Sequence, residues 1–242
     1  MAEILFVHGA LVRDGGWWWQ QVAEQVHDRI GVSSRAIELP SCGEGVGSSP
    51  GTAGLIEDAQ VLTAALDQTD DAVVVGHSYG GTVIAEGADH PAVRHLLYIT
   101  SYLPDIGRSQ AEIMSGEHNP VAIAPNNDGT ISLSGYTAAS GGDRFWQDLT
   151  DEAIRNGAWE RVTSQSVSAF STPTTRAAWR GRPSTYLVCV DDRSTSVELQ
   201  RFYAARATRS INLPTGHHPF LSRPDLVAEH VIEILTRRLQ SS

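Results

Sequence analysis

The chain has no lysine: all 18 of its positively charged side chains, in 242 residues, are arginine. A Walker-type phosphate loop needs a lysine, and so does a Schiff base with a carbonyl substrate, so both chemistries are excluded. The net charge of −10 argues against nucleic acid as a partner.

Long apolar runs and cysteines are also scarce. No apolar stretch is long enough to cross a bilayer, so we expect no membrane partner. Cys42 lies in a loop-like context and Cys189 in a strand-like one, which does not indicate a disulfide framework. The start resembles a core strand rather than a signal peptide, so we expect a cytoplasmic protein. Neither a dinucleotide-binding glycine pattern nor metal-ligand spacing is present, and we expect no cofactor and no metal.

Short apolar segments alternate with longer amphipathic ones over most of the chain. Strands are expected at residues 4–7, 35–39, 72–75, 95–100, 185–190 and 209–213, and helices at 17–28, 52–68, 79–89, 197–207 and 224–239. This alternation predicts an α/β fold with a doubly wound, mostly parallel sheet.

The alternation lapses between residues 103 and 182. Residues 119–142 are rich in Asn, Gly, Ser and Thr, and helical patterns follow at 149–159 and 161–169. We therefore expect a core made of residues 1–102 and 183–242, with a helical lid insertion at 103–182.

The most informative motif is Gly76-His77-Ser78-Tyr79-Gly80, which follows an apolar β-branched run and precedes a helical pattern. A serine on such a strand-to-helix turn presents its hydroxyl outward, so Ser78 is a candidate nucleophile. The backbone N–H of Tyr79 then opens the helix and is a candidate oxyanion donor. Gly47-Ser48-Ser49-Pro50-Gly51 matches the same pattern but lies in a loop-like stretch, so Ser49 is interpreted as a turn residue.

A serine nucleophile needs a histidine base and a carboxylate to orient it. Asp191 and Asp192 follow the strand at 185–190, and His217 and His218 follow the strand at 209–213. The order Ser, Asp, His is the one associated with a serine on a strand-to-helix turn in this architecture. The pattern alone does not decide between the two adjacent aspartates or between the two histidines.

The chain resembles the α/β-hydrolase superfamily, in the branch of small lidded esterases that includes plant hydroxynitrile lyases and methyl-ester esterases. The resemblance rests on segments of the core: Phe6-Val7-His8-Gly9-Ala10, Gly15-Gly16-Trp17-Trp18-Trp19, the Ser78 motif, residues 186–200 and His217-His218-Pro219-Phe220-Leu221. It implies that Asp192 is the acid, that His217 is the base, and that the N–H of Ala10 is the second oxyanion donor.

Together these features predict a serine hydrolase that cleaves an ester or lactone of a small apolar molecule through an acyl-enzyme. Trp17, Trp146 and Trp159 are expected to contact the substrate. An alternative is a lyase or cyclase that uses the same triad for proton transfer, although the lysine that stabilises cyanide in hydroxynitrile lyases is missing. A binding protein on a degenerate hydrolase scaffold is a third hypothesis. The oligomeric state stays open, with a homodimer among the alternatives.

Overall fold

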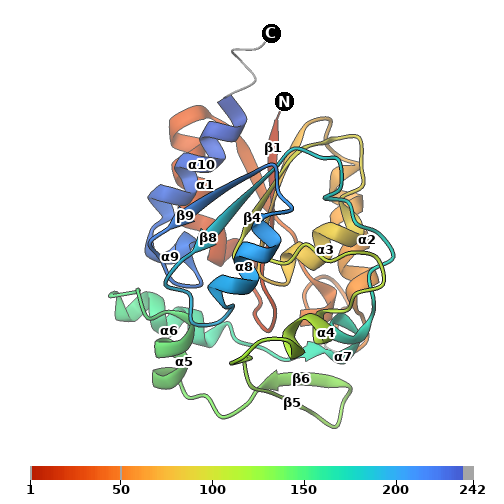
Figure 1. Ribbon diagram of the computed structural model, residues 1–242, viewed down its shortest axis with the longest axis vertical. Helices are drawn as coiled ribbons and strands as arrows, with labels where there is room; N and C mark the ends of the chain where they lie inside the picture. The colour runs from red at the N-terminus through yellow and green to blue at the C-terminus, as the bar shows by residue number, and fades with distance from the viewer. Residues whose placement is uncertain (1, 50, 237–242) are drawn as a thin grey trace.

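A computed structural model describes residues 2–49 and 51–236. Its centre is a six-stranded sheet in the order β2-β1-β3-β4-β8-β9, and every neighbouring pair is parallel (Figure 1). The strands are β1 (Glu3–Val7), β2 (Ser33–Ala36), β3 (Ala72–His77), β4 (Val93–Ile99), β8 (Ser184–Cys189) and β9 (Arg209–Leu213). The prediction of a doubly wound parallel sheet is confirmed.

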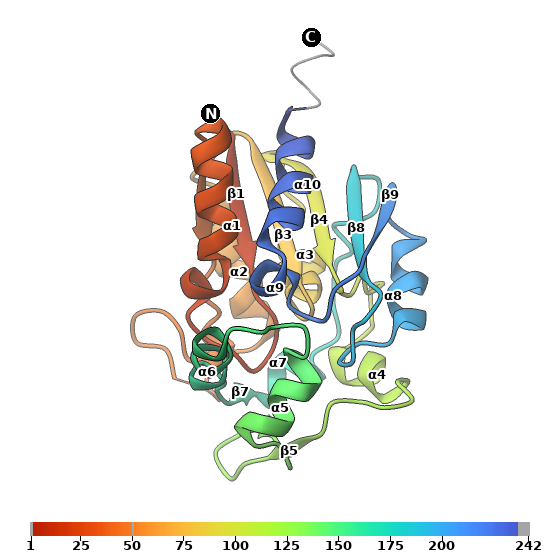
Figure 2. The same cartoon turned by 90° about the vertical axis from the view of Figure 1, so that its left-hand side faces the viewer.

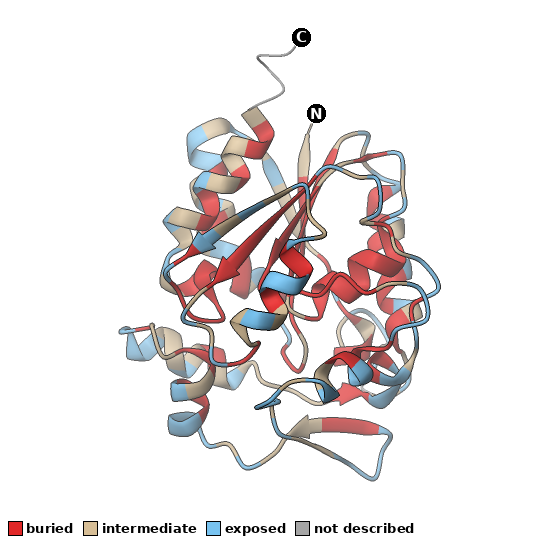
Figure 3. Ribbon diagram, viewed as in Figure 1, coloured by how far each residue is buried: buried red, intermediate tan, exposed pale blue. Residues whose placement is uncertain are grey.

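Helices cover both faces of this sheet. On one face lie α1 (Gly15–Ile30) and α10 (Pro224–Thr236), and on the other lie α2 (Leu55–Leu66), α3 (Gly80–Gly87) and α8 (Val197–Ala204) (Figure 2). Successive side chains of a strand point to opposite faces, so Val73 and Val75 pack towards α1 while Val74 packs towards α2. The central strands β3 and β8 are accordingly buried along their whole length, whereas the edge strands β2 and β9 are partly exposed (Figure 3).

The expected core elements form, with small shifts at their ends. The second strand, expected at residues 35–39, lies earlier, because β2 ends at Ala36. Pro40 then begins the short 3-10 helix η1 (Pro40–Cys42). Residues 237–239 of the last predicted helix lie outside the described residues. Among the described residues, every helix is too short or too polar to span a bilayer.

Between β4 and β8 the chain forms an insertion that is only partly helical. It holds α4 (Gln110–Ser115), β5 (Ile123–Pro125), β6 (Thr130–Leu133), α5 (Ala138–Phe145), α6 (Glu152–Glu160), β7 (Gln165–Ser166) and α7 (Val167–Ser171). The strands form a separate antiparallel sheet in the order β5-β6-β7. The hairpin turns at Gly129, whose φ of 78° suits glycine, while Asp128 Oδ1 accepts a hydrogen bond from the Thr130 N–H. The division into core and lid stays a prediction.

The helix expected at residues 161–169 is wrong. Residues around Val162 are extended, because Val162 bridges Val12 and the Thr163 N–H donates to the Leu11 carbonyl at 2.9 Å. β7 then pairs with β6, and only at Val167 does a helix begin. The β-branched residues here favour an extended backbone once a partner segment is available.

Candidate active site

Ser78 lies on the turn between β3 and α3 and has a positive φ of 50°, which is strained for a residue with a side chain. A Cβ on Gly76 would lie 2.5 Å from Ile84 Cδ1, and a Cβ on Gly80 would lie 2.5 Å from the Val7 carbonyl oxygen. The turn therefore requires glycine at Gly80, where the clash is with backbone, whereas at Gly76 the Ile84 side chain would have to shift.

Asp192 and His217, which follow β8 and β9, meet at the carboxyl edge of the sheet. Asp192 Oδ2 lies 2.7 Å from His217 Nδ1, and the carboxylate is fully buried. Its Oδ1 accepts the N–H groups of Ser194 and Thr195 at 2.6 and 3.1 Å, and the Gln200 amide donates to Oδ2 at 3.2 Å. These donors fix the carboxylate so that it can orient one tautomer of the imidazole.

The neighbours of this pair have other surroundings. Asp191 is exposed. His218 is buried, and its Nδ1 lies 3.1 Å from the Phe145 carbonyl oxygen while its ring packs against Trp18. Burial, together with the charge on His217, lowers the pKa of His218 well below its ordinary value, so the ring is neutral. The geometry therefore favours Asp192 over Asp191 and His217 over His218.

Ser78 and His217 line the same cavity, between the sheet edge and the insertion. Its lining is mostly apolar and includes Leu11, Val12, Met114, Val121, Leu133, Phe145, Trp146, Val162 and Phe170. Among the described residues, no hydrogen bond joins the Ser78 hydroxyl to His217. Such contacts are often long in unliganded sites and tighten when substrate binds.

The two candidate oxyanion donors also lie on this cavity. Ala10 follows β1 and Tyr79 follows Ser78, and both line the cavity wall. In the described part of the chain neither backbone N–H donates to another residue. Both are therefore available to a substrate oxygen, and Tyr79 lies at the N-terminal end of α3, where the helix dipole favours negative charge.

The three tryptophans expected to contact substrate lie in different places. Trp146 lines the cavity, whereas Trp17 and Trp159 lie outside its lining. The Arg161 guanidinium stacks over Trp17 at 4.2 Å, and Trp159 packs edge-on against Trp146. Substrate contact by Trp17 or Trp159 stays a prediction without support from the cavity.

Sequence reasoning missed Gln110, which begins α4 and lines the cavity while its side chain is 1% exposed. Its Oε1 accepts the Thr82 hydroxyl at 2.6 Å, and Thr82 lies one helical turn after Ser78. Its Nε2 has no acceptor among the described residues, so the amide can donate into the cavity. A glutamine at the start of a short helix carries no motif that would have identified it.

His8 and Glu44 brace the loop that carries Ala10. His8 Nδ1 lies 2.8 Å from the Gly9 carbonyl oxygen, and its Nε2 lies 2.6 Å from Glu44 Oε2. Burial alone lowers the pKa of His8, but the hydrogen bond and negative charge of Glu44 outweigh it and raise the pKa. Glu44 also accepts the N–H groups of Asp14 and Leu39, so one carboxylate joins three segments.

His77 forms a hydrogen bond with the backbone of the loop that carries His217. Its Nε2 donates to the His217 carbonyl oxygen at 2.9 Å. Burial, together with the neighbouring His217 imidazole, lowers the pKa of His77 well below the ordinary value. Ring nitrogens of these three histidines lie within 4.8 Å, the spacing of a candidate metal site. Nδ1 of His217 already binds Asp192, so a cation could bind His217 only through Nε2. That is the atom expected to take the serine proton, so a cation there would compete with proton transfer.

Residues 143–148, at the end of α5, tie the insertion to both loops. Asp148 Oδ2 accepts the Gly216 N–H and the Ser222 hydroxyl, each at 2.7 Å. The Gln147 amide donates to the Asp191 carbonyl at 2.6 Å. This segment therefore positions the loops of Asp192 and His217 relative to each other.

Comparison with known proteins agrees with this architecture. The Alpha/beta hydrolase family profile matches residues 4–230. The chain is 29% identical over 245 residues to Alpha/beta hydrolase nvfD of Aspergillus novofumigatus, covering 94% of each, and 23% identical to Methylesterase 8 of Arabidopsis thaliana, covering 96% of this chain and 89% of that protein. A pyrethroid hydrolase from Sphingobium faniae superimposes with a TM-score of 0.82 at 23% identity, covering 99% of this chain and 100% of that one. The chain belongs to the alpha/beta hydrolase family.

Proposed function

We propose that this enzyme is a carboxylic ester hydrolase that cleaves an ester or lactone of a small apolar molecule. The observation that carries the proposal is the 2.7 Å contact between buried Asp192 and His217, on a cavity shared with Ser78 on its strained turn. The names of two relatives, a methylesterase and a carbendazim hydrolyzing esterase, support ester chemistry.

In the proposed reaction, Ser78 Oγ attacks the substrate carbonyl while His217 Nε2 takes its proton. Asp192 holds the Nδ1–H and stabilises the imidazolium. The N–H groups of Ala10 and Tyr79 stabilise the oxyanion of the tetrahedral intermediate. The intermediate collapses, and the leaving alkoxide takes the proton from His217.

Water then attacks the acyl-enzyme with His217 as the base, and the carboxylic acid leaves as Ser78 recovers its proton. A lactone would give the ring-opened hydroxy acid. The apolar cavity wall favours an apolar acyl or alcohol group and excludes bulk water from the reacting atoms.

The test compares Ser78→Ala with Ser49→Ala, because Ser49 lies in the second match to the same motif and is exposed. Hydrolysis of an activated aryl ester should fall on the order of 10⁴-fold in Ser78→Ala and stay at the wild-type level in Ser49→Ala. A fluorophosphonate probe should label the wild type and Ser49→Ala alone. Near-normal activity in folded Ser78→Ala would end the proposal.

The lyase or cyclase alternative uses the same three residues without a covalent intermediate. Mass spectrometry of the enzyme quenched during turnover of an aryl ester distinguishes the two. An acyl mass on the peptide that contains Ser78 supports the hydrolase. Turnover without that adduct, with Ser78→Ala still inactive, favours proton-transfer chemistry.

A further inference from the structure

A buried carboxylate outside the proposed triad, Asp58 of α2, has no assigned role. Asp58 is 0% exposed. Its Oδ1 accepts the Ser41 N–H at 2.9 Å, and its Oδ2 accepts the Ser41 and Tyr79 hydroxyls at 2.6 and 2.8 Å. Burial raises the pKa of this carboxyl, and the three hydrogen bonds oppose that rise. Among the described residues it forms no salt bridge.

One branch of this network leads to the turn after Ser78. The Tyr79 hydroxyl binds Asp58, so the side chain of Tyr79 is fixed at its far end, 0% exposed and stacked parallel to Phe170. The backbone N–H of the same residue is a candidate oxyanion donor. A tyrosine held at both the backbone turn and the hydroxyl cannot rotate that N–H away from the cavity without breaking a buried bond.

The second branch leads to the loop after β1. The Gln165 amide nitrogen donates to Ser41 Oγ at 2.9 Å, and Gln165 Oε1 accepts the Leu11 N–H at 2.9 Å. Leu11 has a φ of 60°, which is strained for leucine. The Leu11 N–H belongs to the peptide group between Ala10 and Leu11. This hydrogen bond therefore fixes the orientation of that peptide group, which is adjacent to the Ala10 N–H, the other candidate oxyanion donor.

Along the whole network each hydrogen bond is donated toward Asp58. Gln165 donates to Ser41, and Ser41 and Tyr79 both donate to Asp58, which acts only as an acceptor. Ser41, Asp58 and Gln165 are each 0% exposed. Burying a carboxylate that has no salt-bridge partner is costly, and an apolar residue would serve packing alone at least as well.

We propose that Asp58 is a positioning residue that sets the distance between the two oxyanion donors, through Tyr79 on one side and through Ser41 and Gln165 on the other. This inference rests on the proposed function. It assigns Asp58 no contact with substrate. It predicts that loosening either branch weakens stabilisation of the oxyanion more than it weakens substrate binding.

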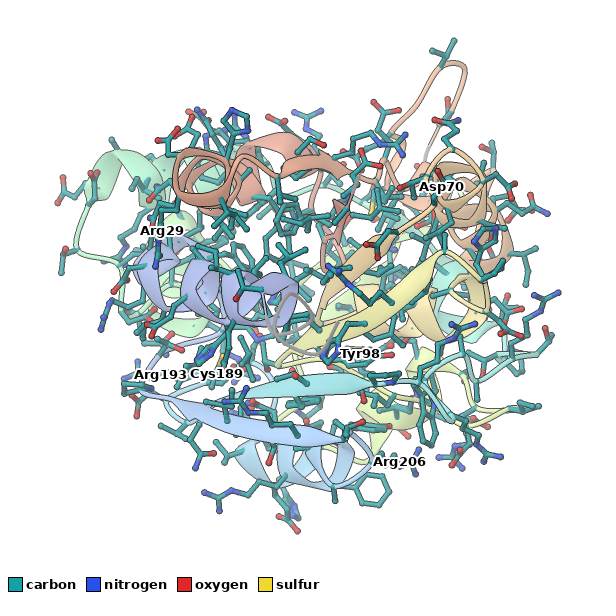
Figure 4. The ribbon with its side chains drawn as sticks, turned by 90° about the horizontal axis from the view of Figure 1, so that it is seen from above. Arg29, Asp70, Tyr98, Cys189, Arg193 and Arg206 are labelled. Atoms are coloured by element: carbon teal, nitrogen blue, oxygen red, sulfur yellow. The ribbon has the colours of Figure 1, made fainter. Side chains whose placement is uncertain are left out.

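The experiment removes one hydrogen bond at a time. Tyr79→Phe deletes only the hydroxyl on Asp58, and Gln165→Met cuts the link to Leu11. Tyr98→Phe is the matched control; Tyr98 lies on β4 and is labelled in Figure 4. It is also 0% exposed, but its hydroxyl has no partner among the described residues. Circular dichroism checks that each variant folds.

Each branch variant should lower kcat for an activated aryl ester by about tenfold, and the double variant by about a hundredfold, the loss typical of one oxyanion donor. KM should change by less than about twofold, because uniform binding is unaffected. Affinity for an aryl boronic acid, whose serine adduct carries an oxyanion-like oxygen, should fall in parallel with kcat. Tyr98→Phe should match the wild type in all three measurements.

Asp58→Asn supplies the conservative variant. Its amide can keep contacts with Ser41 N–H and with both hydroxyls, which can donate or accept, so it should retain more of kcat than Asp58→Leu. The proposal is overturned when folded Tyr79→Phe and Gln165→Met keep kcat within about twofold of wild type while Ser78→Ala is inactive. It is also overturned when only KM changes. Activity in Ser78→Ala would instead refute the proposed function itself.

Discussion

Replacing Asp192 with asparagine tests the central contact of the site at nearly constant shape. The Ser194 and Thr195 N–H groups both point at Oδ1, so the asparagine carbonyl must occupy that position. The new NH₂ group then takes the place of Oδ2, 2.7 Å from His217 Nδ1 and 3.2 Å from the Gln200 amide nitrogen. His217 can then only accept at Nδ1, which leaves its proton on Nε2, facing the serine it should deprotonate.

The expected loss in kcat is on the order of 10⁴-fold, or about 5.5 kcal/mol of transition-state stabilisation, because the wrong tautomer cannot act as a base. Initial rates with an activated aryl ester measure it, and near-ultraviolet circular dichroism checks the fold. Asp191→Asn is the matched control, since Asp191 is adjacent and exposed, and it should keep wild-type activity. An Asp192→Asn enzyme within about tenfold of wild type, or an equal loss in Asp191→Asn, refutes the reasoning.

Three further changes probe other parts of the site. Gly80→Ala should destabilise the fold by about 2 kcal/mol in urea unfolding, because its Cβ would lie 2.5 Å from the Val7 carbonyl oxygen; unchanged stability would contradict this. Gln110→Leu should lower kcat/KM about tenfold for esters with a second carbonyl or ether oxygen, and leave plain alkyl esters nearly unchanged; an equal effect on both classes would show that Gln110 makes no polar contact. Burial keeps His218 neutral in the folded state, whereas the unfolded chain takes up its proton near pH 6.5, so stability is lost as the pH falls below that value. His218→Phe should remove about 1.4 kcal/mol of the loss at about pH 5.5, seen as a shallower pH dependence of the unfolding free energy, and an unchanged slope would contradict the assignment.

The sequence predicts the parallel sheet well because the periodicity of its strands is a local property. Several core strands contain a short apolar run, such as Ile4-Leu5-Phe6-Val7 in β1 and Val73-Val74-Val75 in β3. The motif around Ser78 is recognised from five consecutive residues, although the groups closest to a Cβ on Gly76 or Gly80 lie outside it. The edge strand β2 is the least regular, and its predicted bounds are the poorest. Its sequence, Ser33-Ser34-Arg35-Ala36, has no apolar run.

The insertion is predicted poorly because its structure depends on distant partners. The extended backbone at Val162 pairs with Val12, some 150 positions away in the sequence, and no local sequence pattern predicts that pairing. The hairpin near Gly129 lies in a stretch whose polar composition is typical of a loop. Likewise, the choice of Asp192 over Asp191 needed the resemblance to a family, since adjacent residues share one local context.

The hydrogen bonds from Gln147 and Asp148 to the loops that carry Asp192 and His217 have a consequence for how substrate preference can change. Substitutions in that half of the insertion should therefore alter turnover and selectivity together, so few of them are expected to change substrate preference alone. The β5–β6 hairpin and the segment just before it contribute Leu133 and Val121, both apolar, to the cavity lining. Divergence in substrate preference should therefore accumulate on the hairpin, and directed-evolution libraries are best concentrated there.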